Sequence, residues 1–186
     1  MKSSDLATDL LSGCGTRLGH SQAVAEQAGI VAALLDEPWR AALVDAAWLH
    51  DIGYAPSVAE TGFHPLDGAR WLRVHGWSSP VCNLVAWHTR AGTEAMLRGL
   101  GGELEVEFFL PPGPVQAALA WADLTSSPTG ERCSAEERIA EILSRYAPDS
   151  VVHRATRANE TELLHDAHLM ERLANQQRTV TTVVHR

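Results

Sequence analysis

Residues 46–54 read Ala-Ala-Trp-Leu-His-Asp-Ile-Gly-Tyr, an apolar segment that ends in an adjacent histidine and aspartate. The residues from Trp39 onward are rich in alanine and other apolar side chains, which predicts a helix over Trp39–His50 with Gly53 as its breaker. His50 and Asp51 therefore stand at the end of a helix that packs in the protein interior. A buried charge is costly unless it is neutralised, so this pair indicates a functional site.

Further residues of the same chemical types occur where a helix would otherwise present an apolar side chain. His20 falls on one helical face with Val24, Ala28 and Val31. A chain that directs several imidazoles and carboxylates into its own core needs a cation there, and a metal ion is the simplest one. The other candidate ligands in this pattern are His64, His88 and Asp123.

Imidazole nitrogen and carboxylate oxygen are ligands that suit Fe, Mn, Co, Ni and Zn, so we expect one or two divalent transition metal ions. Asp51 has two oxygens and can be shared between two ions. Two ions about 3.5–4 Å apart can hold a phosphoryl group and activate water near neutral pH. In this prediction the first site consists of His20, His50, Asp51 and Asp123, and the second adds His64 and His88.

The composition is that of an ordinary globular protein, with 45% hydrophobic and 20% charged residues among 186. A net charge of −8 argues against nucleic acid polymers and anionic membranes as partners. The three cysteines are far apart and form no CxxC spacing, which is typical of reduced thiols in a cytoplasm. We therefore expect a cytoplasmic protein without a secretion signal, and we make no prediction of its oligomeric state.

Helical periodicity dominates the chain and strand signals are almost absent, so the predicted class is all-α. Expected helices include Ser4–Ser12, His20–Leu35 and Ser150–Asn175, the last followed by a frayed or strand-like tail. Ser134 and Glu137 form a capping-box pattern at the start of another helix. Residues 103–110 fit either a short strand or an irregular lid.

The order of these ligands resembles the HD-domain superfamily of metal-dependent phosphohydrolases. Residues 19–28 (GHSQAVAEQA) are similar to the family's first histidine helix, and 46–54 (AAWLHDIGY) to its central motif. Residues 63–72 (FHPLDGARWL) and 85–92 (VAWHTRAG) are similar to segments of subfamilies with two metals, the second of them in hydrolases of dinucleoside tetraphosphates. Residues 118–127 (ALAWADLTSS) match the last aspartate helix.

The resemblance implies an all-α bundle that holds metal between its helices, in one domain over residues 1–186 with the core at about 15–145. It implies His20, His50, Asp51 and Asp123 as the basic ligand set, with His64 and His88 as the extra pair of a dinuclear site. Many relatives have lysine at the position of Tyr54, where it can meet substrate phosphate, and a tyrosine can offer only a hydroxyl.

For phosphate contacts we consider Arg90 first, because it follows the candidate ligand His88 by two residues; Arg70 and Arg132 come next. Asp51 is the expected catalytic carboxylate together with Arg90. The nearby tryptophans favour core packing over base stacking, and the second His-Asp pair, His165-Asp166, favours a solvated helix face. Loop hydroxyls that can reach a phosphate are those of Ser126, Ser127 and Thr129.

Three functions fit this sequence. The first is hydrolysis of a nucleotide or another small phosphate ester by metal-activated water. The second is an oxygenase, because some HD-fold proteins with six ligands hold two irons and cleave C–C or C–P bonds with O₂. The third is a regulatory module that binds a nucleotide without turnover. Ligand identity does not separate the first two, and intact ligands at all six positions argue against the third.

Overall fold

The computed structural model describes the backbone of residues 1–184 and the side chains of residues 1–177. Within this part the chain is helical, and its extended pairing is limited to one isolated β-bridge between Ser126 and Arg132. The predicted all-α class is confirmed. The elements in chain order are α1 (Ser3–Leu11), α2 (Arg17–Ala32), α3 (Trp39–Leu49), the 3-10 turn η1 (Ile52–Tyr54), α4 (His64–Val74), α5 (Ser79–Trp87), the 3-10 turn η2 (His88–Arg90), α6 (Ala91–Arg98), α7 (Gly101–Glu107), α8 (Gly113–Leu124), α9 (Ala135–Arg145) and α10 (Val151–Val184).

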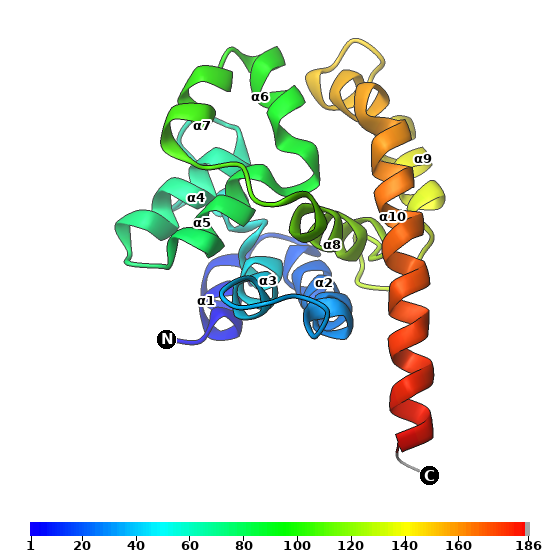
Figure 1. Ribbon diagram of the computed structural model, residues 1–186. Helices are drawn as coiled ribbons and strands as arrows, with labels where there is room; N and C mark the ends of the chain where they lie inside the picture. Colours follow the sequence, from blue (N-terminus) through cyan, green and yellow to red (C-terminus); the bar gives the residue numbers. More distant parts are fainter. Residues whose placement is uncertain (185–186) are drawn as a thin grey trace.

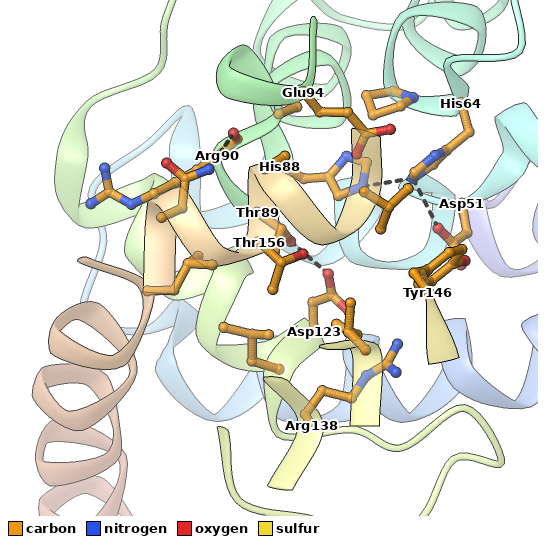
Figure 2. A pocket seen from close by; sticks show the side chains of 18 of the residues that line it. Asp51, His64, His88, Thr89, Arg90, Glu94, Asp123, Arg138, Tyr146 and Thr156 are labelled. Carbon is orange, nitrogen blue, oxygen red and sulfur yellow. Dashed lines mark hydrogen bonds and ion pairs between the residues drawn. The ribbon is translucent and has the colours of Figure 1, made fainter. Parts of the chain in front are cut away.

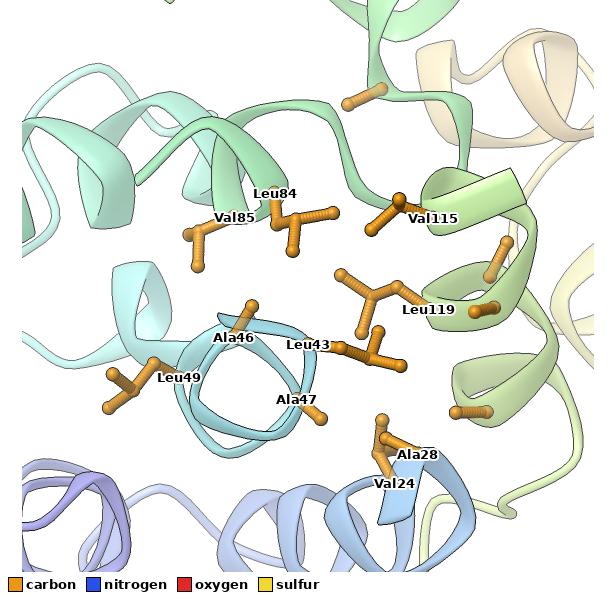
Figure 3. Packing of buried hydrophobic residues seen from close by; sticks show 14 of the residues in the cluster. Val24, Ala28, Leu43, Ala46, Ala47, Leu49, Leu84, Val85, Val115 and Leu119 are labelled. Carbon is orange, nitrogen blue, oxygen red and sulfur yellow. The ribbon is translucent and has the colours of Figure 1, made fainter. Parts of the chain in front are cut away.

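Helix α3 occupies the centre of the bundle and is surrounded by α2, α5 and α8 (Figure 3). Its alanines, Ala46 and Ala47, are fully buried and let the neighbouring helices approach closely. Leu43 packs between α2 and α8 and is also fully buried. The apolar segment of residues 46–49 is therefore at the centre of the core, and His50 and Asp51 follow it at the end of α3.

The structure decides three further expectations from the sequence. Of the undecided residues 103–110, the first five lie in helix α7, and residues 108–110 lie outside any helix or strand. The capping box of Ser134 and Glu137 is present with both of its hydrogen bonds. The expectation of a frayed or strand-like tail after Asn175 was wrong for the described residues, because α10 continues to Val184.

Helix α10 runs along one side of the bundle, past α8 and α9, and its C-terminal part continues beyond the other helices (Figure 1). Its N-terminal half packs against α6, α8 and α9. None of the helices in the described part of the chain is long and apolar enough to cross a membrane.

Candidate metal centre

The six predicted ligands come from distant parts of the sequence and lie together in the bundle. They fall into two groups, and within each group the ligand atoms lie within 4.8 Å of one another. Nε2 of His50 in the first group is 3.6 Å from Oδ1 of Asp51 in the second, so the two groups adjoin. The first group is His20, His50 and Asp123, and the second is Asp51, His64 and His88.

Main-chain carbonyls fix the orientation of three of the four histidine rings. In each of these rings Nδ1 lies within hydrogen-bond distance of a carbonyl oxygen, which makes Nδ1–H the donor. When such a ring is neutral, its lone pair is on Nε2, on the side of the other ligands. The three distances are 3.0 Å from His20 to Ser127, 2.9 Å from His50 to Ala47, and 2.7 Å from His88 to Val85.

The Nε2 atoms lack the donors that would satisfy them. Nε2 of His50 is buried and has no hydrogen-bond partner among the described residues. Nε2 of His64 and Nε2 of His88 face each other at 3.1 Å. Burial lowers the pKa of His50, and it lowers the pKa of His64 well below the ordinary value, so both rings are neutral near pH 7. Converging imidazole nitrogens of this kind are suited to a metal cation.

Asp51 lies between the two groups and has a different partner on each oxygen. Its Oδ1 is 3.4 Å from Nε2 of His64, while its Oδ2 accepts a hydrogen bond of 2.7 Å from Arg17. Burial alone would raise the pKa of this carboxyl, but His50, His64 and Arg17 outweigh it and hold the pKa well below the usual range. Asp51 is thus ionised, with Oδ1 directed to the histidines.

His20 and Asp123 lie within ion-pair distance of each other. Nε2 of His20 lies 3.1 Å from Oδ1 of Asp123. Burial lowers the pKa of His20, but the hydrogen bond to Asp123 and the negative charges of Asp123 and Asp51 together outweigh it, so this pKa is raised. Metal ligands must be deprotonated, so an ion at this position would displace the proton of His20.

The turn that carries His88 has a strained backbone. Thr89 and Arg90 adopt φ values of 48° and 59°, in the left-handed region that residues with a Cβ rarely occupy. Such strain persists only where the surroundings fix it, and it is common at functional sites. Here Thr89 donates a hydrogen bond to Oδ2 of Asp123 and Arg90 is ion-paired to Asp166.

His64 is positioned by close backbone packing and by a buried carboxylate. A Cβ placed on Gly53 would lie 2.0 Å from the carbonyl oxygen of His64, so only glycine permits this approach. Asp67 is 2% exposed and accepts hydrogen bonds from the amides of residues 60–62. These bonds hold the loop that leads into His64, and sequence reasoning did not identify Asp67.

The ligands open onto a cavity of about 140 Å³ (Figure 2). His20, Asp51, His64, His88 and Asp123 line it, and His50 lies behind them at 1% exposure. Sequence reasoning missed several of the other lining residues. The cationic and aromatic ones are Arg17, Arg138, Arg145 and Tyr146.

Arg17 had a signal in the sequence, because it precedes His20 by three residues and so shares its helical face. Its guanidinium carbon lies 3.2 Å from the centroid of the Tyr54 ring. That ring in turn stacks on His64 with centroids 4.0 Å apart. A cation therefore stands beside Tyr54, which lacks the charge of the lysine found in many relatives.

The arginines considered from the sequence have other partners. Arg90 lines the cavity, but its guanidinium donates to Asp166 at 2.7 Å and points away from the ligands (Figure 2). Arg70 lies outside the cavity and pairs with Glu103 and Glu107. Arg132 also lies outside it and pairs with Glu171.

The remaining candidates are structural in this arrangement. The described tryptophans near the ligands do not line the cavity, and Trp121 is fully buried in the core. The hydroxyl of Ser126 donates to the carbonyl of Ala122. His165 is exposed, in line with a solvated face, whereas Asp166 is half-buried because it pairs with Arg90.

A family model described as HD domain matches residues 17–149, which is well over half of the chain. The chain belongs to the HD domain family. The resemblance to metal-dependent phosphohydrolases is thereby confirmed, and the two ligand groups of this HD domain are arranged to hold divalent metal. Comparison with curated proteins and with solved structures gave no significant match. The match ends before α10, which supplies part of the cavity wall.

Proposed function

We propose that this HD domain protein hydrolyses a small phosphate ester with a metal-activated water. The observation that supports this most directly is the pair of adjoining ligand groups at the floor of a cavity whose walls carry arginines. His20, His50 and Asp123 would hold one ion, and Asp51, His64 and His88 a second. A divalent metal bound at these positions would lower the pKa of a bound water to near neutral pH. The metal charge would also neutralise phosphoryl oxygens.

The chain's own residues supply the remaining electrostatics. Arg17 and Arg138 line the cavity and provide positive charge for the non-bridging oxygens of a phosphate. Arg138 pairs with Glu141, but only 12% of its side chain is exposed and its buried Nε has no hydrogen-bond partner among the described residues. Its charge is therefore little screened by solvent. Thr89 holds one oxygen of Asp123 and leaves the other toward His20.

The test is phosphate release from nucleotides, dinucleoside polyphosphates and simple phosphate esters. The protein is stripped of metal and then given Mn²⁺, Fe²⁺, Co²⁺, Ni²⁺ or Zn²⁺ in turn. We expect release that depends on metal and is lost in Asp51→Asn. The matched control is Asp45→Asn, because Asp45 lies on α3 but contacts Ser3 instead of the metal ligands.

No release with any metal, although metal is bound, would overturn this proposal for these substrates. The same six ligands also suit the di-iron oxygenase, so that result would be followed by anaerobic iron loading and O₂ uptake measurements. Ligand binding without release or O₂ uptake would instead support the regulatory module.

A further inference from the structure

Helix α10 forms a wall of the cavity although it lies outside the residues that match the HD domain. Five of its residues line the same cavity as the metal ligands. The match therefore accounts for the floor of the site, and the wall is a property of this chain. The wall residues are Val152, Ala155, Thr156, Asn159 and Leu163.

The wall is mainly apolar and is completed by two neighbouring helices. Ile142 of α9 and Leu124 of α8 line the same cavity. Ala155 and Leu163 are buried, at 5% and 3% exposure. An apolar surface that lines the same cavity as metal ligands and arginines fits a substrate with a charged end and an apolar end.

Contacts between α10 and the strained turn fix this wall relative to the metal ligands. Asn159 donates from Nδ2 to the carbonyl of Arg90 at 3.4 Å and accepts from the hydroxyl of Thr93 at 2.9 Å. Further along α10, Asp166 pairs with the guanidinium of Arg90. The turn that carries His88 is thus attached to α10 at two points, and α6, which follows the turn, at a third. The wall and the floor therefore form one preorganised site.

The cavity also limits the size of the organic group. Its volume is about 140 Å³, and an apolar cavity of about 150 Å³ holds one benzene molecule. The metal ions and the phosphate occupy part of the same space, because the metal ligands line it too. One six-membered ring is therefore the upper limit for the organic group that the cavity encloses, and a nucleoside exceeds it.

We propose that the inner face of α10 recognises the organic part of the substrate, and that the substrate is a phosphate monoester with a compact, largely apolar group of about one ring. This inference rests on the proposed hydrolysis for the phosphate end only. The recognition of the organic group is a binding property and can be measured without turnover.

The experiment is calorimetric titration of the zinc-loaded protein with phosphonates, whose C–P bond is not hydrolysed. The probes are methylphosphonate, phenylphosphonate, 1-naphthylphosphonate and the phosphonate analogue of adenosine 5′-monophosphate, which serves as the nucleotide. We expect phenylphosphonate to bind at least tenfold more tightly than methylphosphonate, and the nucleotide to bind no more tightly than methylphosphonate. Equal affinities for the phosphonates, or tightest binding of the nucleotide, would overturn the inference.

Two substitutions assign the effect to α10. Ala155→Met fills the cavity and should remove the advantage of the phenyl group while methylphosphonate binds as before. Ala167→Met is the matched control, because Ala167 is a buried alanine on the same helix that does not line this cavity. Leu163→Ala enlarges the cavity and should improve 1-naphthylphosphonate binding, which decides the matter if Ala155→Met does not fold.

The two proposals fail in different ways. If the phosphonate pattern is found but no phosphate ester is hydrolysed, the proposed hydrolysis fails and the role of α10 stands. If esters are hydrolysed but Ala155→Met and Leu163→Ala leave every phosphonate affinity unchanged, the role of α10 fails alone.

Discussion

The hydroxyl of Thr89 donates a hydrogen bond of 2.5 Å to Oδ2 of Asp123, which leaves Oδ1 as the oxygen that faces His20. A neighbour that holds one oxygen of a ligand carboxylate orients the other for metal binding. Thr89 is therefore a positioning residue for the first ligand group, and its strained φ of 48° is part of that arrangement.

We expect Thr89→Val to weaken metal binding by about tenfold to a hundredfold, because the carboxylate loses its orienting donor. Valine keeps the shape and the β-branch of threonine, so the backbone is affected in the same way. Thr89→Ser restores the hydroxyl and should bind metal almost as well as the unaltered protein. Competition with a chromophoric chelator measures the affinities, and equal weakening by both variants would show that Thr89 acts through packing instead.

Arg17 connects Asp51 to the stacked rings of Tyr54 and His64. We expect Arg17→Gln to lower kcat/KM about tenfold to a hundredfold, since Asp51 loses an orienting partner and the cavity loses a cation. Arg17→Lys keeps the charge but loses the planar guanidinium over the Tyr54 ring, so its kcat/KM should lie between that of Arg17→Gln and that of the unaltered protein. Arg154→Gln, an exposed arginine on α10, is the control and should leave kcat/KM unchanged.

Gly53 lies against the backbone of His64, where a Cβ would be 2.0 Å from the carbonyl oxygen. Gly53→Ala should therefore lower the free energy of unfolding by at least about 2 kcal/mol, because neither backbone segment can move freely in the core. Gly29 provides the contrast, since it lies exposed in α2 with no atom within 4 Å of its added Cβ. Gly29→Ala should raise the free energy of unfolding by about 0.5–1 kcal/mol. Chemical denaturation compares them, and a Gly53→Ala variant as stable as the unaltered protein would contradict the packing described here.

Glu107 of α7 pairs with Arg70 and Arg73 of α4, the helix that begins at His64. The hydrogen bond from Arg70 lowers the pKa of Glu107 below its ordinary value of 4.5. A carboxyl whose pKa is lower in the folded state than in the unfolded state stabilises the folded protein at any pH above the unfolded-state pKa. This contribution is lost as the pH falls through the folded-state pKa.

Glu107→Gln should accordingly reduce the free energy of unfolding at pH 7 by about 1 kcal/mol. The effect is this small because the ion pairs are partly exposed and are screened by solvent. The difference from the unaltered protein should shrink as pH falls below 4.5. Denaturation at a series of pH values measures it, with the exposed neighbour Glu105→Gln as control. A difference that stays constant into the acid range would show that Glu107 acts through packing and not through its charge.

The helices and the ligands follow from local patterns, and so they could be predicted from the sequence. His20 shares a helical face with buried Val24 and Ala28, which is a regularity of neighbouring residues. The role of Gly53 was only partly predictable, because a helix breaker and a site of close backbone approach look alike in a sequence. What distinguishes them is the carbonyl of His64, and no periodicity reveals that contact.

The cavity wall could not be predicted for a similar reason. Thr156 and Asn159 look like ordinary polar residues of a long helix, and their place in the cavity of the ligands depends on how α10 crosses the bundle. Arg90 illustrates the converse: its position next to His88 in sequence suggested a phosphate contact, but the left-handed turn directs its guanidinium to Asp166. Tertiary packing, and not the local sequence, determines both the position of the α10 residues in the cavity and the direction of the Arg90 side chain.

The ligand groups join segments that are far apart in the chain, with His20 and Asp123 separated by 103 positions. Only the assembled bundle can present all six residues at once, so the unfolded chain has no comparable affinity for metal. Metal at a thousand times its dissociation constant would then add about 4 kcal/mol to the free energy of unfolding. The centre would act as a cross-link between five segments, and a cell short of metal would hold less of this protein, because the unloaded chain is open to proteolysis.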